Sequence, residues 1–249
     1  MHRTHAAGDT LEGDFFEAWA EIGGRLRKAR VFVTTLPCSN VYSAKAYPIE
    51  RLESLLDGLN SSFEHFGGLT RRVVLDNTSL AVKKILVGTE REETKAFHGW
   101  RGSLPLHADF CAPASGWEKV AVERGARCVQ GLFFQPVPKA ATWDELNAML
   151  RAELDADMDR RKLRDGRTAR QAWIAEREHL RPLPPRMPEA ARVVTGVSDK
   201  YPIVTLDRAR PRDRIHSSVG LRPPGNRPEP LPSVGGHPLG VPIPRAPVR

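Results

Sequence analysis

The chain has 249 residues and a formal net charge of +8, and 40% of its side chains are hydrophobic, which is sufficient for one large packed domain or two small ones. It contains no apolar run of about 18 residues that would cross a membrane, and no apolar segment near the N-terminus that would act as a secretory signal. Its three cysteines are too few for a disulfide framework and lack zinc-ligand spacing, so we expect a cytoplasmic protein in a reducing compartment.

Three strands are predicted in the first fifty residues. Residues 14–20 are rich in apolar side chains, residues 30–35 are β-branched and aromatic, and residues 41–47 alternate between two faces. A turn at residues 21–24 separates the first strand from the second, and Pro37 ends the second. Because the connections are short, we expect an antiparallel meander.

The pattern then changes to helical spacing. Apolar residues recur every three to four positions over 49–66, which predicts an amphipathic helix, and the short apolar run 72–75 predicts a buried strand parallel to a neighbour. Residues 79–100 are expected to be mostly helical, 106–111 to form the last strand, and 117–129 to form a helix. This order of elements is that of the ribonuclease H-like fold, so we expect an α/β protein with a mixed five-stranded sheet flanked by helices.

The chain is expected to divide into five parts. Thr142, followed three residues later by Glu145, predicts a capped helix after the α/β core. The last 43 residues hold ten prolines and eight arginines and carry +5 of the net charge, so we expect a disordered tail and a near-neutral folded part. The predicted parts are a short extension (1–13), the core (14–138), a helical segment with a proline-rich linker (139–188), a small partial β domain (189–206) and the Arg/Pro-rich tail (207–249).

Three carboxylates are predicted to meet in such a fold. Asp14 lies on the first strand, Asp76 follows the strand after the crossover helix, and Glu123 lies early in the last helix of the core. Carboxylate oxygens are the ligands that Mg²⁺ prefers, and such a trio is typical of two-metal phosphoryl transfer. The alternative stays open that these acids are structural, because the chain has 30 acidic residues and three near strand or helix ends are easily found by chance. Glu118 competes with Glu123 for the third position.

Polar and basic residues near the predicted carboxylates are candidate nucleic-acid contacts. Lysine pairs such as the one in this group are more often simply solvated, and His65, His98 and His107 are expected at the surface or at helix caps. The candidate contacts are Asn77, Lys83, Lys84, Lys119 and Arg124.

Several segments resemble a known family. They are Phe63-Glu-His-Phe-Gly-Gly, Arg71-Arg-Val-Val-Leu-Asp-Asn77, Phe110-Cys-Ala-Pro-Ala-Ser-Gly-Trp-Glu-Lys119, Thr142-Trp-Asp-Glu-Leu-Asn147 and Asp155-Ala-Asp-Met-Asp-Arg160. Over residues 12–206 the chain is similar to bacterial insertion-sequence transposases of the IstA type, which carry an integrase catalytic core of the DDE class. The family's first Asp follows a Gln-Val pair, where this chain has Glu12-Gly13. Val120 stands where the family usually has Gly.

The resemblance implies an activity and a set of partners. By the family pattern the triad is Asp14, Asp76 and Glu123, holding Mg²⁺ or Mn²⁺. The expected reaction is cleavage of DNA at the ends of an element, followed by transfer of the freed 3′ end into target DNA. Expected partners are DNA, further copies of the chain in a homo-oligomer, and an ATPase helper protein. The protein is expected in the bacterial cytoplasm, associated with the nucleoid when bound to DNA.

Two further hypotheses remain beside this one. The family has a helix-turn-helix region before the core and a longer C-terminal β domain, whereas here 13 residues precede Asp14 and the Arg/Pro tail follows Leu206. A truncated or frame-disrupted copy explains both ends. Such a copy is expected either to retain activity or to be an inactive remnant that binds DNA or interferes with full-length transposase. The last hypothesis is a non-enzymatic α/β protein with structural acids.

Overall fold

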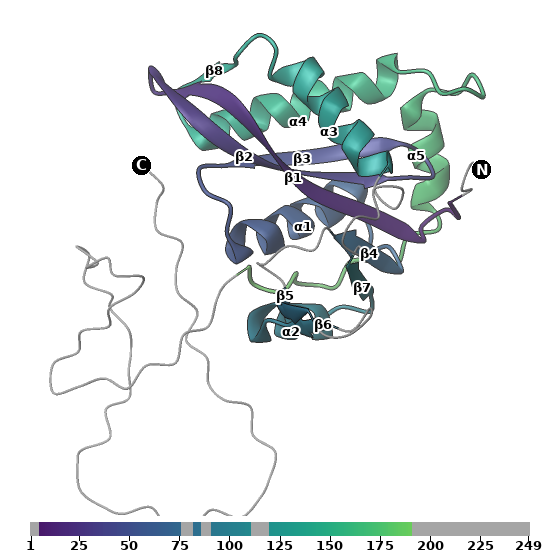
Figure 1. The fold of residues 1–249 in the computed structure, drawn as a ribbon. Coiled ribbons are helices and arrows are strands. Elements are labelled where there is room, and N and C mark those ends of the chain that lie inside the picture. Colours follow the sequence, from purple (N-terminus) through teal and green to yellow (C-terminus); the bar gives the residue numbers. More distant parts are fainter. Residues whose placement is uncertain (1–4, 76–81, 86–90, 111–119, 191–249) are drawn as a thin grey trace, which may run out of the picture. The chain divides into compact units, whose positions relative to one another are not determined.

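A computed structural model of the chain describes residues 5–75, 82–85, 91–110 and 120–190, with the backbone alone for 82–85, 91–93 and 120. These residues belong to one compact unit, shown in Figure 1. The strands are β1 (Thr10–Ile22), β2 (Arg25–Leu36), β3 (Val41–Tyr47), β4 (Arg72–Leu75), β5 (Val82–Ile85), β6 (Arg91–Glu93), β7 (His107–Phe110) and β8 (Lys139–Ala140). The helices are α1 (Leu52–Phe66), α2 (Lys95–Gly102), α3 (Val120–Phe133), α4 (Trp143–Arg160) and α5 (Ala169–Arg177).

The main sheet has the expected mixed topology. Its strand order is β3-β2-β1-β4-β7, and the short strand β8 adds a sixth member by pairing with the far end of β1. β1, β2 and β3 form the predicted antiparallel meander, and β4 and β7 run parallel to β1. The five expected strands are confirmed. β8 was not predicted, because it has only two residues and shows no strand pattern in the sequence.

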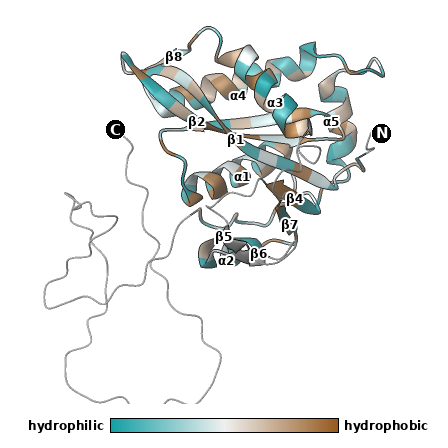
Figure 2. Cartoon of the chain, in the orientation of Figure 1, coloured by the Kyte–Doolittle hydropathy of each residue, from teal (hydrophilic) through white to brown (hydrophobic). Residues whose placement is uncertain are grey.

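Helices cover both faces of the sheet, with α1 and α2 on one side and α3 and α4 on the other (Figure 1). Alternate residues of β1 supply the two cores: Leu11 packs in a cluster with α1, whereas Ala18 and Ala20 pack in a second cluster with α3 and α4. We call the second side the α3 face. Figure 2 shows β4 as mainly hydrophobic and the helices as mixed, as expected for a central strand between amphipathic helices.

The edge strand β3 is closed by a side chain of α4. The Asn147 amide oxygen accepts a hydrogen bond from the backbone N–H of Ala46 at 2.7 Å, and its amide nitrogen donates to the Ala46 carbonyl at 3.0 Å. Asn147 therefore occupies the place of one residue of a further strand and satisfies backbone groups that an edge strand otherwise presents to other chains.

Helix α5 ties together segments that are far apart in the sequence. The Glu176 carboxylate accepts hydrogen bonds from the backbone N–H groups of Gly8, at 3.1 Å, and Ser39, at 2.9 Å. The segment after α5 also packs on the core, since Leu69 and Arg181 form an antiparallel bridge and Asn60 donates to the Pro188 carbonyl. The start of β1 and the β2–β3 turn thus depend on residues near the end of the described chain.

Two expectations differ from the structure. Residues 79–100 were expected to be mostly helical, but β5 and β6 pair as a two-stranded antiparallel sheet, and of the residues that the structure describes in this range those of α2 are helical. Strands β1 and β2 are also longer than predicted. β1 begins earlier, at Thr10, because residues 10–13 pair with β4, and the residues on either side of the β1–β2 turn form a hairpin end in which hydrophobic alternation is weak. None of the described helices is both long enough and apolar enough to span a bilayer.

Candidate active site

Asp14 lies on β1 just beyond the point where β1 pairs with β4. Its side chain is half-buried on the α3 face, because its cross-strand partner Val33 belongs to the cluster beneath α3 and α4. Its Oδ1 accepts a hydrogen bond from the backbone N–H of Phe15 at 2.8 Å, which fixes the carboxylate against its own strand.

The register between β1 and β4 bears on the second predicted acid. Leu75, the last residue of β4, pairs in parallel with Gly13, the residue before Asp14. Asp76 follows Leu75 directly in the sequence and lies outside the described residues. In parallel sheets, ligands bind at the carboxyl ends of strands, which is the edge where β4 ends beside Asp14.

Glu12 fastens the start of α3 to β1. Its carboxylate is buried, with 4% of the residue exposed, and Oε2 accepts a hydrogen bond from the backbone N–H of Val122 at 3.1 Å. Val122 is in the first turn of α3, where backbone N–H groups lack a partner inside the helix and the helix dipole favours a negative charge. Since residues two apart on a strand point to the same side, Glu12 and Asp14 both face α3.

Glu123 follows Val122 directly, so the hydrogen bond from Glu12 positions the third predicted acid near β1. Glu123 is exposed, and its Oε2 lies 3.7 Å from a guanidinium nitrogen of Arg127, one turn further along α3. Arg124, a predicted nucleic-acid contact, is also exposed on α3. The first two turns of α3 therefore present one carboxylate and two cations to solvent.

Helix α3 approaches the sheet closely at Gly125. A methyl group at this position would lie 2.6 Å from the Thr35 hydroxyl and 3.0 Å from the ring of Tyr42. Glu12, Thr35 and Tyr42 are successive cross-strand partners over β1, β2 and β3. Helix α3 thus rests on one row of the sheet, with Val122 bonded to Glu12 and Gly125 against the other two residues.

The other predicted contacts are less well placed. Lys83 and Lys84 lie on β5, of which the backbone alone is described, and Asn77 and Lys119 lie outside the described residues. Within the described ranges no group of three acidic, histidine or cysteine side chains is close enough to hold a metal ion, and Asp76 is not among the side chains compared.

Comparison with known sequences decides the relationship. A transposase of Aminobacter aminovorans is 36% identical over 143 residues, covering 57% of this chain and 28% of that protein. The transposase of insertion sequence element IS21 of Pseudomonas aeruginosa is 28% identical over 179 residues, covering 70% of this chain and 45% of that protein. Over these regions the chain is similar to insertion-sequence transposases. The IS21 relative supports the resemblance to the IstA type, and the chain spans less than half the length of both relatives. No protein-family model matches it.

The fold of the chain is similar to that of retroviral integrase structures. One chain of the simian T-cell lymphotropic virus intasome, solved with the PP2A regulatory subunit B56 gamma, superimposes with a TM-score of 0.54 at 19% identity, covering 79% of this chain and 65% of that one. The catalytic core domain of HTLV-2 integrase in complex with magnesium gives a TM-score of 0.50 at 13% identity, covering 68% of this chain and 99% of that one. The expected ribonuclease H-like fold is thereby confirmed.

Two residues that position the candidate site were not predicted from the sequence. Glu12 stands where the resembled family has Gln, and its even spacing from Asp14 was the available signal that it shares the same face. Gly125 lies at helical spacing from Val122, and a glycine inside an amphipathic helix indicates close packing.

Proposed function

We propose that the chain is the catalytic core of a DDE-type transposase, which cleaves DNA at the ends of an element and joins the freed 3′ ends to target DNA. Asp14, Asp76 and Glu123 are the proposed catalytic residues. The activity of the longer relatives is carried over as part of this proposal, since the chain covers only a part of their length.

The observation that carries the proposal is the convergence of three chain segments at one edge of the sheet. β4 ends at Leu75 beside Gly13, one residue before Asp14, and Asp76 is the next residue in the sequence, which supports the proposal that Asp76 joins Asp14. The hydrogen bond between Glu12 and Val122 brings the first turn of α3, with Glu123, over the same part of β1. The three proposed acids belong to segments that are more than forty residues apart in the sequence.

The donor set fits a hard divalent cation. The proposed ligands are carboxylate oxygens, which Mg²⁺ and Mn²⁺ prefer over nitrogen or sulfur. When bound, such ions make a water or a 3′-hydroxyl a stronger nucleophile and offset the charge on the leaving oxygen. The HTLV-2 integrase core of the same fold was solved in complex with magnesium, which supports this assignment.

The chain's own residues supply position and charge. Asp14 is held against its strand by the N–H of Phe15, and the turn that carries Glu123 is held over β1 by the hydrogen bond that the Val122 N–H donates to Glu12. Arg124 and Arg127 place positive charge beside the carboxylates, where a phosphodiester would approach. The residues therefore bind and orient the DNA backbone, while the carboxylates hold the cation.

The proposed partners follow from the same resemblance. DNA is the substrate, and the protein assembles with further copies of itself, as supported by the trimeric and dimeric forms in which the HTLV-2 core was solved. An ATPase helper protein and association with the nucleoid are proposed from the IstA-type resemblance alone.

The test is a strand-transfer assay with Mn²⁺ and duplexes that carry the sequences flanking the coding region. Asp14→Asn, Asp76→Asn and Glu123→Gln are each expected to abolish product while leaving the fold unchanged by circular dichroism. Glu64→Gln, which removes the charge of an exposed acid on α1, is the matched control and should retain activity. If the unmodified chain forms no product yet still shifts DNA in a gel, it is an inactive DNA-binding remnant and the proposal is wrong.

A further inference from the structure

The end of the β1–β2 hairpin is a cationic arm. Residues 23–28 are all exposed and include Arg25, Arg27 and Lys28. Lys28 lies 2.5 Å from the Glu17 carboxylate, so its charge is compensated. Among the described residues, no acidic side chain forms an ion pair with Arg25 or Arg27. The arm therefore holds two uncompensated guanidinium groups.

These two arginines lie on the same face of the sheet as Asp14. Arg27 is the cross-strand partner of Ala20, which is fully buried in the cluster beneath α3 and α4, and Arg25 is the partner of Ile22, which packs against that cluster. Residues directly opposite each other on antiparallel strands point to the same side. Both side chains therefore emerge at the margin of the α3 face.

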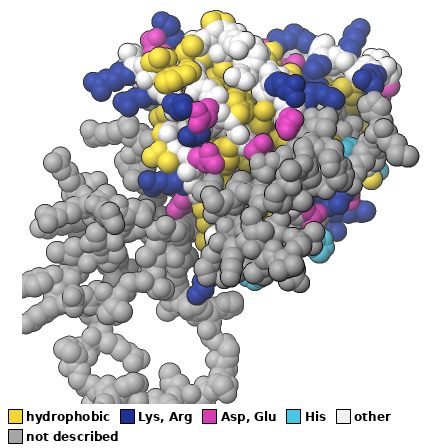
Figure 3. Space-filling view, viewed as in Figure 1, with side chains coloured by type: hydrophobic (Ala, Val, Ile, Leu, Met, Phe, Trp, Pro, Cys, Tyr) yellow, Lys and Arg dark blue, Asp and Glu magenta, His cyan; other side chains and the backbone are white. Residues whose placement is uncertain are grey.

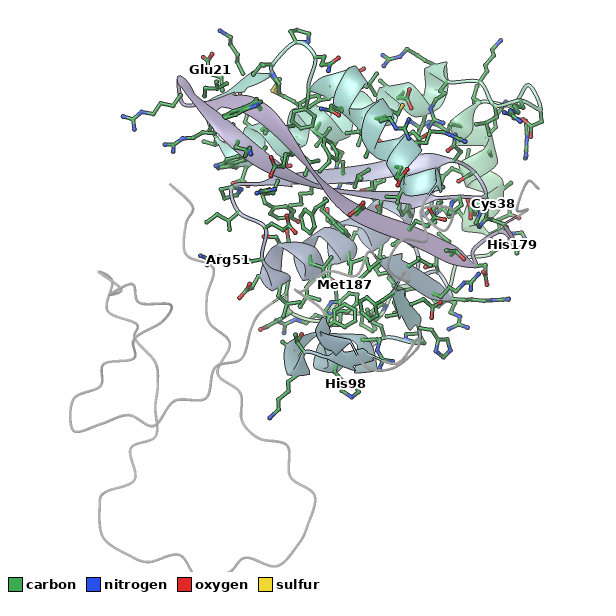
Figure 4. The ribbon with its side chains drawn as sticks, in the orientation of Figure 1. Glu21, Cys38, Arg51, His98, His179 and Met187 are labelled. Atoms are coloured by element: carbon green, nitrogen blue, oxygen red, sulfur yellow. The ribbon has the colours of Figure 1, made fainter. Side chains whose placement is uncertain are left out.

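Two further cations lie on α3, beside Glu123 or one turn from it. Arg124 and Arg127 are exposed on α3, and the side chain of Arg127 is 79% exposed. Figure 3 shows Lys and Arg side chains projecting around the hairpin end, and Figure 4 places Glu21, near the tip of β1, at the opposite end of the view from Cys38 and His179. The α3 face thus carries cations from the carboxylates to the tip of the arm.

The spacing matches duplex DNA. Ala20 lies six positions and Ile22 eight positions beyond Asp14 on β1, which corresponds to about 20 to 26 Å of extended strand. At about 3.4 Å per base pair this length is about six to eight base pairs, less than one turn of B-form DNA. If one phosphate of a duplex lay at the carboxylates, the same face of the duplex would extend to the arm within one helical turn.

We propose that Arg25 and Arg27 extend the candidate active site into a phosphate-binding surface for duplex DNA, continuous with Arg124 and Arg127. The proposal rests on the proposed function, and it assigns a contact about six to eight base pairs from the reacting phosphate. The opposite face of the hairpin differs in chemistry. There Trp19 is 49% and Leu26 61% exposed, and the cations Lys28 and Arg30 share the Glu17 carboxylate. The α3 face of the hairpin therefore differs from the opposite face in carrying unpaired guanidinium groups, and it is the face that we expect to bind a polyanion.

The salt dependence of DNA binding tests this surface. The full chain, in EDTA, is titrated against a labelled duplex of about two helical turns between about 50 and 200 mM salt. Each phosphate contact adds about 1 to the slope of log binding constant against log salt concentration, so Arg25→Ala with Arg27→Ala should lower the slope by about 2. Arg25→Lys with Arg27→Lys keeps both charges and should keep most of the slope.

The matched control removes the same charge elsewhere. Lys95→Ala with Arg186→Ala changes two exposed cations, one on α2 and one in the segment after α5, which packs on the α1 side. This control should retain the slope of the unmodified chain. Thermal melting of each variant confirms that the fold is unchanged, as expected for substitutions at exposed positions.

The outcomes separate this inference from the function on which it rests. A slope for Arg25→Ala with Arg27→Ala equal to that of the unmodified chain overturns the proposed surface, even if catalysis is confirmed. The same variant losing self-association at an unchanged slope also overturns it, because the arm would then contact protein. If the unmodified chain shows no salt-dependent DNA binding, both this inference and the proposed function fail.

Discussion

The buried carboxylate of Glu12 accepts a hydrogen bond from the backbone N–H of Val122, 110 residues further along the chain. One bond thereby joins the strand that carries Asp14 to the helix turn that carries Glu123. It places a negative charge at the positive end of α3, where a carboxylate also satisfies an N–H group that the helix leaves unpaired.

Removal of this acceptor should disturb the site more than the fold. Glu12→Ala is expected to lower the free energy of unfolding by about 1–3 kcal/mol, because the buried Val122 N–H loses its partner. The same variant should lower strand transfer at saturating Mn²⁺. Hydrogen exchange at the Val122 amide provides a direct measurement, since the amide should lose its protection in Glu12→Ala.

Glu12→Gln is the control, because its amide oxygen still accepts the hydrogen bond and Gln is the residue of the resembled family. It should retain the amide protection and most of the activity. Equal protection of the Val122 amide in Glu12→Ala and the unmodified chain would show that the bond does not position α3.

Two glycines of α3 provide a matched pair for the packing of this helix on the sheet. Gly125→Ala should lower the free energy of unfolding by about 1–3 kcal/mol, because its methyl group would overlap the Thr35 hydroxyl and the Tyr42 ring. Gly131→Ala, with no atom within 4 Å of the new methyl group, should raise it by about 0.5–1 kcal/mol through helix propensity. Denaturant unfolding measures both changes, and equal signs would contradict the close approach of α3.

The Asn147 clamp predicts a coupled effect on stability and association. Asn147→Ala leaves the N–H and carbonyl of Ala46 without their partner, so the free energy of unfolding should fall by about 1–3 kcal/mol. Because β3 would then be an open edge, sedimentation should also show concentration-dependent association. Asn147→Asp keeps the acceptor and loses the donor, so its free energy of unfolding should lie between those of the unmodified chain and Asn147→Ala. A monomeric and fully stable Asn147→Ala would show that the clamp has no role.

His65 joins α1 to α4 and is expected to make stability depend on pH. Its side chain is 7% exposed, in contrast to the expectation of a surface or cap histidine, although it does lie in the last turn of α1. Its Nδ1 is 2.9 Å from an Arg151 guanidinium nitrogen. Burial, together with the charge of Arg151, lowers the pKa of His65 from 6.5 to about 4.

The sign follows from proton binding. Between pH 6.5 and pH 4 the unfolded chain binds a proton at His65 and the folded chain does not, so acidification through this window favours unfolding. The loss should reach about 3 kcal/mol near pH 4 and grow no further below it from this group. His65→Gln should show a smaller loss of stability than the unmodified chain, whereas His98→Gln, at an exposed position of α2, should behave as the unmodified chain. If the free energy of unfolding depended on pH in the same way in all three proteins over this range, the assignment to His65 would be wrong.

Local patterns determined how much could be predicted. Strands β3 and β4 match the sequence prediction in both bounds, because each has a clear pattern and ends at a turn residue or proline. The region 79–100 was predicted wrongly because Val82, Ile85 and Leu86 have the spacing of a helix, whereas pairing between β5 and β6 is not a local property. The hydrogen bond between the Val122 N–H and Glu12 could not be predicted for the same reason, because it joins residues 110 positions apart in the sequence. The placement of Asp76 stays a prediction.

The two hydrogen bonds of Glu176 have a consequence for the order in which the protein is made. They join residues 168 and 137 positions apart in the sequence, so the segment before β1 and the β2–β3 turn receive a partner from a helix synthesised near the end of the described region. Closing loops of this length costs entropy before the contacts compensate for it. On the ribosome, the segment that leads into the strand carrying Asp14 therefore acquires its hydrogen bond to Glu176 only after α5 has emerged.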